Sequence, residues 1–268
     1  MLISKVALFV TKLAFEHQLI TISAGTKMIR LVFFWILATT SLAAEPDWNI
    51  YDELLSSHLA AAEKDGLALN LVNYESIAAD PNFYSIVNQI ILFDVEQLNS
   101  TQEKLAFYIN AYNILTIKLI LDNWPVASIR DIGNFFKGPW DVVVLENADG
   151  KLTLDDIEHN IIRTFNEPRI HFALNCASVS CPDLRHEAYR ADQLDEQLDD
   201  QTRLFLDNAK GLLLDGDRLR LSKIFDWYAV DFEVFGSLEN FVKLYRPELQ
   251  FDNVRTNLRY NWNLNSTP

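Results

Sequence analysis

Both cysteines of the chain stand in one short segment that also carries a histidine and two serines. The segment covers residues 169–184 and reads RIHFALNCASVSCPDL, with His171, Cys176 and Cys181 in it. A thiolate is a strong nucleophile, and a nearby imidazole or free backbone N–H groups activate it. These residue types therefore suit attack of a thiol on a carbonyl carbon, with Cys176 as the nucleophile and His171 as a base.

The cysteines could instead form a disulfide or be inert thiols, and a metal site is a weak further alternative. The spacing of Cys176 and Cys181 allows a disulfide if the segment curls enough to bring the two Cα atoms within about 6–7 Å. Cysteines spaced C-x₄-C with scattered histidines match no standard zinc site, so we expect no metal and no cofactor.

If the apolar run 170–175 is a buried strand, its side chains alternate, and His171 and Cys176 lie on opposite faces. A direct pair would then require the chain to turn at Asn175.

A buried carboxylate is expected on a second segment. We predict a helix over residues 153–165, and its apolar stripe includes Glu158. An inward carboxylate is costly unless it is paired or protonated. Glu158 should therefore orient a catalytic base, act as an acid or base itself, or form a structural ion pair with Arg163 or Arg169. His159 points away from the centre of the stripe, toward a cleft at its edge or toward solvent.

Two amides lie on the longest predicted helix, which begins after a capping box of Ser100 and Glu103 and ends before Pro125. Apolar residues on nearly all its faces predict that this helix is buried in the middle of the domain. Asn110 and Asn113 are three residues apart and are therefore neighbours on it. Since buried amides need hydrogen-bond partners, they should position a substrate or hold a loop by its backbone. We favour the loop.

The remaining elements mix helices and strands without a regular strand–helix–strand alternation. This pattern favours an α+β fold, a helix-rich single domain whose buried central helix packs on a small, mainly antiparallel sheet. The predicted helices cover 48–64, 83–92, 191–209, 223–232 and 237–245, the extended segments 67–74 and 258–265, and the hairpins 140–154 (turning at Asp149-Gly150) and 212–222.

Four segments in this order closely resemble the family catalogued as domain of unknown function 547. They are LAFYINAYNILTIKLIL, LTLDDIEHNIIR, RIHFALNCASVSCPDLR and IFDWYAVDF, and the resemblance covers about residues 102–232. It implies exported bacterial relatives and plant relatives, and it implies no settled activity. The polar positions to which it draws attention are Asn110, Asn113, Glu158, His159, His171, Asn175, Cys176, Ser178, Cys181 and Asp231.

A buried helix followed by a strand that bears a histidine also resembles the papain and transglutaminase arrangement. In those enzymes a cysteine on the helix faces the histidine, whereas the helix here offers Asn110. Such an analogy concerns fold alone. It leaves two options: the thiol has moved to Cys176, or the protein is a non-catalytic relative.

The N-terminus predicts export. Met28 is followed by Arg30, by an apolar stretch over residues 31–38, and by small residues that suit cleavage after Ala43 or Ala44. This is the layout of a secretory signal peptide, and it suggests that Met28 is the true start. An uncleaved anchor is the alternative, although a membrane span needs roughly 20 apolar residues.

The predicted organisation is a signal region over residues 1–43 and one globular domain over residues 44–268. We expect a periplasmic or extracellular protein without a stable membrane span after signal cleavage, in a compartment where a disulfide is the default. Removing residues 1–43 changes the net charge from −14 to −17, because four cations and one anion are lost. A chain with this much negative charge repels phosphate backbones, and we therefore expect no nucleic acid as its partner. We expect a small molecule or a peptide instead.

Two main hypotheses of function follow; a redox role of the cysteines is a third, which the spacing C-x₄-C disfavours because it lacks the close thiol pair of C-x-x-C. The first is a thiol-dependent hydrolase or acyltransferase acting on amide or ester bonds, with Cys176 as nucleophile, His171 or His159 as base, Glu158 as orienting group and Asn113 as oxyanion donor. The second is a non-catalytic binding or scaffold module in which the two cysteines form a structural disulfide. The other polar positions are predicted to line the binding site: Asn110, Asn175, Ser178, Cys181 and Asp231.

Overall fold

The fold is taken from a computed structural model, in which the chain divides into the units Met1–Ser41 and Leu42–Pro268. The residues that the structure describes all belong to the second unit, and they are 45–134, 136–147 and 150–268. The predicted signal region, the predicted start at Met28 and the turn residue Asp149 lie outside the described residues.

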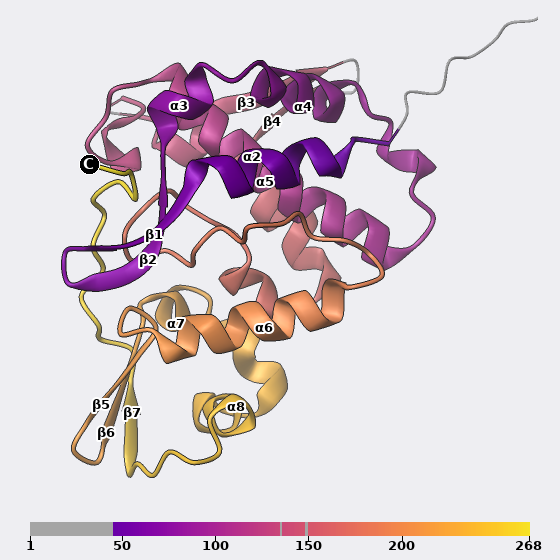
Figure 1. The fold of residues 1–268 in the computed structure, drawn as a ribbon. Coiled ribbons are helices and arrows are strands. Elements are labelled where there is room, and N and C mark those ends of the chain that lie inside the picture. The colour runs from indigo at the N-terminus through magenta and orange to yellow at the C-terminus, as the bar shows by residue number, and fades with distance from the viewer. Residues whose placement is uncertain (1–44, 135, 148–149) are drawn as a thin grey trace, which may run out of the picture. The chain divides into compact units, whose positions relative to one another are not determined.

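The described residues form an α+β fold with three small sheets (Figure 1). Two sheets are antiparallel hairpins, β1–β2 and β3–β4, and the third has the order β5-β6-β7 with β6 and β7 parallel. The helices are α2 (Trp48–His58), α3 (Tyr74–Ala78), α4 (Pro81–Leu92), α5 (Thr101–Asp122), α6 (Leu194–Asp207), α7 (Ile224–Trp227) and α8 (Leu238–Tyr245). The strands are β1 (Leu59–Lys64), β2 (Leu67–Val72), β3 (Val143–Asn147), β4 (Gly150–Thr153), β5 (Leu212–Asp215), β6 (Arg218–Leu221) and β7 (Asn253–Arg255).

Helix α5 is the buried central helix that its sequence predicts. Its capping box forms as expected: Glu103 N–H donates to Ser100 Oγ at 3.1 Å, and Ser100 N–H donates to Glu103 Oε2 at 2.8 Å. The helix packs against α3, α4 and β3. It is long and apolar enough to cross a membrane, but 78% of its most apolar window is buried inside the domain, as in a core helix.

The first predicted helix is too long. Helix α2 ends at His58, and residues 59–64 form strand β1. A turn at Asp65 and Gly66, both with positive φ, folds β2 back on β1 so that Leu59 pairs with Val72. The backbone pairing of this hairpin outweighs the helix propensity of the alanines in the segment.

The predicted strand over residues 170–175 is wrong. Residues Pro168–Phe172 form a 3₁₀ helix, η7, because Pro168 suits its first position and the Glu167 side chain accepts a hydrogen bond from Arg169 N–H at 3.1 Å. Strand alternation therefore does not separate His171 from Cys176. A papain- or transglutaminase-like fold, which requires a strand histidine, is not confirmed.

The predicted helix over residues 153–165 forms two irregular pieces. A π-helix, η5, covers Asp156–Ile161, and a 3₁₀ helix, η6, covers Ile162–Phe165. Thr153 and Asp156 cap this segment, since Asp156 N–H donates to Thr153 Oγ1 at 3.0 Å and Thr153 N–H donates to Asp156 Oδ2 at 3.0 Å. Single π-turns are often found at functional sites.

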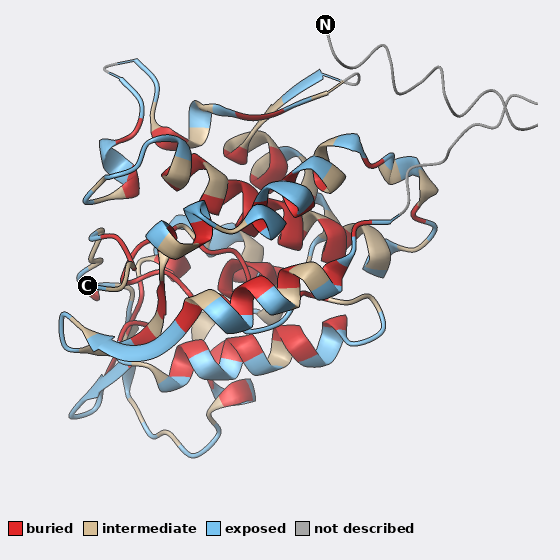
Figure 2. Cartoon of the chain, turned by 45° about the horizontal axis from the view of Figure 1, so that its top comes forward, coloured by how far each residue is buried: buried red, intermediate tan, exposed pale blue. Residues whose placement is uncertain are grey.

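Two hydrophobic cores meet at η7. The larger surrounds α5 and includes Ile170, whereas the smaller consists mostly of aromatic rings around Phe172. His171 lies between these two residues, so the helix that carries it is anchored in both cores. Figure 2 shows the buried residues collected along the inner faces of the helices.

Candidate functional site

Cys176 lies in a tight turn that follows η7. Its Sγ lies 3.2 Å from the hydroxyl of Tyr260 and 3.3 Å from Oγ of Ser178, and its backbone N–H donates to Sγ of Cys181 at 2.7 Å. Ala177 has a positive φ of 56°, in the left-handed region. Cys176 is partly exposed, whereas Cys181 is buried.

The two thiols differ in acidity. Burial raises the pKa of Cys176, but hydrogen bonds from Cys181, Ser178 and Tyr260 outweigh burial, so the net pKa lies below the usual value. Burial and the hydrogen bond to Cys176 raise the pKa of the Cys181 thiol well above its usual range. Both cysteines are free, so the predicted structural disulfide is not formed in this structure.

Glu158 is buried, with 5% of its surface exposed, but its partners are not the predicted arginines. The hydroxyl of Tyr112 donates to Glu158 Oε2 at 3.1 Å. Tyr228 also forms a side-chain hydrogen bond with Glu158, and burial together with this carboxylate raises the pKa of Tyr228. Two phenols, rather than an ion pair, therefore satisfy the buried carboxylate.

His171 is oriented by a carboxylate that the sequence did not single out for that role. Its Nε2 lies 2.7 Å from Oδ2 of Asp231, and Asp231 also accepts two hydrogen bonds from Arg163, at 2.7 and 2.8 Å. The imidazole is stacked on the ring of Tyr228, with 3.8 Å between centroids. Asp231, rather than Glu158, is thus the residue that holds the imidazole.

His159 contacts Arg163, the arginine that also binds Asp231. Its Nδ1 is 2.9 Å from Nη1 of Arg163, and its Nε2 is 3.4 Å from Oδ1 of Asp155. Among the hydrogen bonds of the described residues, none joins His159 or His171 to the thiol of Cys176. The expected dyad of thiol and imidazole is therefore not in direct contact. The charge of Glu158 lies close enough to Cys176 to oppose the lowering of the pKa of its thiol. Tyr228 connects Glu158 with His171, because it is hydrogen-bonded with the carboxylate and stacked on the imidazole.

Asn113 serves the loop and not an oxyanion. Its Nδ2 donates to the carbonyl of Ala173 at 3.0 Å, and its Oδ1 accepts from Asn175 N–H at 2.8 Å. The side chain is 3% exposed, and it faces these backbone groups. This argues against the predicted role of Asn113 as an oxyanion donor.

Asn110 and Asn175 also hold backbone rather than lining a binding site. Asn110 bridges both polar backbone groups of Tyr189, with both distances 2.8 Å. Asn175 accepts from Ala177 N–H at 2.9 Å and donates to the carbonyl of Pro182 at 2.6 Å. Each amide satisfies one donor and one acceptor of an irregular segment, so Asn110 holds the chain at Tyr189 and Asn175 holds the turn that carries Cys176.

Aromatic rings flank the thiol on one side. Tyr260, which contacts Cys176, packs against Trp227 with centroids 4.8 Å apart and against Trp262 with centroids 4.5 Å apart. Trp227 is 47% exposed. The thiol therefore lies beside an accessible aromatic surface, which suits contact with an apolar or ring-bearing ligand group.

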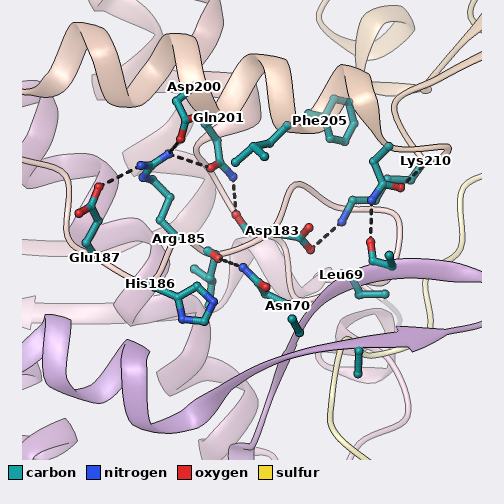
Figure 3. Close-up of a pocket in the computed structure, with 16 residues that line it drawn as sticks. Leu69, Asn70, Asp183, Arg185, His186, Glu187, Asp200, Gln201, Phe205 and Lys210 are labelled. Carbon is teal, nitrogen blue, oxygen red and sulfur yellow. Dashed lines mark hydrogen bonds and ion pairs between the residues drawn. The ribbon is translucent and has the colours of Figure 1, made fainter.

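A spacious cavity lies elsewhere in the described part of the chain. It has a volume of about 730 Å³ and lies between the β1–β2 hairpin, the segment 183–187 and helix α6 (Figure 3). Lys210 reaches Asp183 there at 2.6 Å, and Arg185 pairs with Asp200 at 2.6 Å. Cys176, Glu158, His159 and His171 do not line it.

Across the described ranges, no group of three or more His, Cys, Asp or Glu side chains is arranged to hold a metal ion.

The sequence did not predict three contributors to the group of polar side chains around Cys176 and His171. They are Tyr228, Tyr260 and the contact of Arg163 with Asp231. Tyr228 and Asp231 share the segment 224–232, so their common motif was a usable signal. No local pattern singled out Tyr260, which is 84 residues from Cys176 along the chain.

Comparison with known families covers part of this site. Residues 95–206 match the family model described as "Protein of unknown function, DUF547". The matched segment contains α5, η5, η7 and the cysteine turn, whereas Tyr228, Asp231 and Tyr260 follow it. Comparisons with curated proteins and with solved structures gave no significant match. The segment 95–206 therefore matches the DUF547 family of proteins of unknown function, in agreement with the resemblance of the four sequence motifs.

Proposed function

We propose that the protein is a thiol-dependent hydrolase or acyltransferase that acts on an amide or ester bond, with Cys176 as its nucleophile. The observation that carries this proposal is the environment of the thiol. It is partly exposed, its sulfur is hydrogen-bonded with the hydroxyls of Tyr260 and Ser178, and its pKa lies below the usual value. Reactive cysteines have such environments, whereas structural cysteines are buried and inert.

In the proposed reaction the thiolate of Cys176 attacks the carbonyl carbon, and the carbonyl electrons move to oxygen. The tetrahedral intermediate collapses to a thioester as the amine or alcohol leaves with a proton. Water or an acceptor then attacks the thioester and regenerates the thiol. This two-step course is the usual one for nucleophilic catalysis by cysteine.

The proton transfers are assigned to the group formed by Glu158, Tyr228 and His171. Burial lowers the pKa of His171, although Asp231 opposes this effect, so the imidazole is in its neutral form near pH 7 and has a lone pair with which to accept a proton. Asp231 fixes the orientation of the ring. A substrate or one water molecule would have to connect this group to the thiol, since no direct hydrogen bond does.

A simple ester tests the proposal without knowledge of the natural substrate. Wild-type protein incubated with p-nitrophenyl acetate should release a burst of nitrophenolate and gain the mass of one acetyl group on Cys176, as mapped by peptide mass spectrometry. Cys176→Ser and iodoacetamide-treated protein should lose the burst, while Ser56→Ala, on the exposed face of α2, should keep it. Acetylation of lysines alone would instead support the non-catalytic binding or scaffold module.

We also propose that the protein is exported and that its partner is a small molecule or a peptide. The signal-like segment 28–43 and the acidic charge of the remaining chain support this. N-terminal sequencing of the protein from a secretion-competent host should begin at Ala44 or Glu45. Retention of residues 1–43 in the mature protein would contradict it.

A further inference from the structure

The geometry points to a second reaction of the cysteine turn. We propose that Cys176 and Cys181 form a reversible dithiol–disulfide couple, in which a hydroperoxide oxidises Cys176 and Cys181 resolves the product. This inference goes beyond the proposed acyl chemistry and does not depend on it, because it needs only the two thiols.

The turn already brings the two cysteines together. Cys181 N–H donates to the carbonyl of Ser178 at 3.0 Å, which folds the segment back on itself. Sγ of Cys181 consequently lies 2.7 Å from the backbone nitrogen of Cys176, and the two thiols are hydrogen-bonded to each other. A disulfide requires Cα atoms about 4.4–6.8 Å apart, and a sulfur in contact with the backbone of its partner is within this reach.

The surroundings of the two sulfurs divide the roles between them. Cys176 is partly exposed, and its sulfur is hydrogen-bonded with two hydroxyls; exposure and thiolate character are what make cysteines react with oxidants. Cys181 is 3% exposed, and its thiol faces the turn, with the carbonyl of Leu174 at 3.7 Å. A dissolved peroxide therefore reaches Cys176 first, while Cys181 is confined next to it.

The chemistry balances in two steps. The thiolate of Cys176 attacks one peroxide oxygen, so that an S–O bond forms, the O–O bond breaks, and the alkoxide leaves as an alcohol after taking a proton. Sulfur loses two electrons, and the peroxide gains them. The sulfur of Cys181 then attacks that of Cys176, so that the S–S bond forms, the S–O bond breaks, and hydroxide leaves as water with the proton from Cys181.

The first step also prepares the second. The negative charge of a Cys176 thiolate and its hydrogen bond are among the causes that raise the pKa of Cys181. Oxidation to the neutral sulfenic acid removes that charge, so Cys181 loses its proton more readily only after Cys176 has reacted. The pair thus remains reduced until an oxidant arrives.

The experiment uses the full chain and tert-butyl hydroperoxide, without any ester. Wild-type protein should lose the mass of two hydrogens, and dithiothreitol should restore it. Cys181→Ser should stop at the sulfenic acid, which dimedone traps on residue 176, and Cys176→Ser should react at least tenfold more slowly. Circular dichroism checks that both variants are folded.

If a variant unfolds, peptide mapping of the oxidised wild type decides, since it must show the 176–181 link within one chain. Links between chains, or sulfinic acid at Cys176 with Cys181 still reduced, would overturn the inference. The ester assay is a separate measurement. A chain that forms the link but is never acetylated keeps this inference and overturns the proposed function, and the reverse result does the opposite.

Discussion

Nε2 of His171 lies 2.7 Å from Oδ2 of Asp231, and this contact has opposite consequences for the two pKa values. The hydrogen bond from His171 and those from Arg163 lower the pKa of Asp231 well below its usual range, against the effect of burial. Burial lowers the pKa of His171 in spite of Asp231 and Glu158. The pair is thus a carboxylate and a neutral imidazole at pH 7, which is the form that suits a general base.

The stability of the fold should fall as the pH decreases below about 6.5, the usual pKa of histidine. In that window the unfolded chain binds a proton at His171 that the folded chain does not, so the free energy of unfolding rises with pH. Each pKa unit corresponds to about 1.4 kcal/mol. The lowered pKa of Asp231 adds no slope there, because its stabilisation is lost only at more acidic pH.

Urea unfolding at pH 7.5 and 5.5 measures this slope. His171→Gln should reduce the difference between the two pH values, whereas His186→Gln, at an exposed position, should leave it unchanged. Equal slopes in the wild type and His171→Gln would show that His171 titrates normally in the folded protein.

Iodoacetamide should alkylate Cys176 and spare Cys181 while the protein is folded, because only Cys176 is partly exposed. The rate should depend on pH with a midpoint below that of an ordinary thiol. Tyr260→Phe removes one hydroxyl donor, and a hydrogen bond to a charged group contributes about 1.5–3 kcal/mol, so alkylation at pH 7 should slow about tenfold or more.

The matched control is Tyr84→Phe, because Tyr84 is half exposed and its hydroxyl is directed at the carbonyl of Ala78, in another part of the chain. Mass spectrometry counts the alkyl groups. Two groups added at equal rates, or an unchanged rate in Tyr260→Phe, would be incompatible with the activated thiol.

Asn113→Ala should destabilise the protein by about 2–4 kcal/mol, because one buried donor and one buried acceptor lose their partners together. Asn82→Ala, at an exposed position in the first turn of α4, is the control and should change stability by about 0.5 kcal/mol or less. The measurement is the free energy of unfolding in urea. A loss under 1 kcal/mol for Asn113→Ala would mean that its amide is not needed to hold the turn.

Tyr112→Phe should cost about 1–3 kcal/mol, since it deprives the buried carboxylate of Glu158 of a donor. The cost should fall when Glu158 is replaced by Gln, which carries no charge. A double-mutant cycle of Tyr112→Phe and Glu158→Gln therefore gives a coupling free energy of about 1 kcal/mol or more. A coupling near zero would show that the two side chains do not interact.

Local signals account for a large part of the fold. The capping box of Ser100 and Glu103 and the continuous apolar character of α5 were sufficient to predict a buried central helix. The hairpins β3–β4 and β5–β6 also follow from their alternating strands and turn residues. These features depend on neighbours within a few residues, which is why a single sequence reveals them.

The segment around the thiol was less predictable. Residues 170–174 (IHFAL) resemble a short apolar strand, but Pro168 and the N-capping Glu167 precede them, and residues 168–172 form a 3₁₀ helix. Short apolar runs do not distinguish a buried strand from a buried helical turn. The error propagated, because the alternation argument about His171 and Cys176 depended on the strand.

By itself, the sequence determined the α+β class, the buried helix with its two amides, the inward carboxylate of Glu158 and the resemblance to the DUF547 family. Only the tertiary structure decided that Tyr260 reaches Cys176, that Asp231 pairs with His171 and that Asn113 binds a backbone turn. Each of these contacts joins residues 60 or more positions apart. Their proximity depends on how the two cores pack around η7, and local spacing carries no information about that packing.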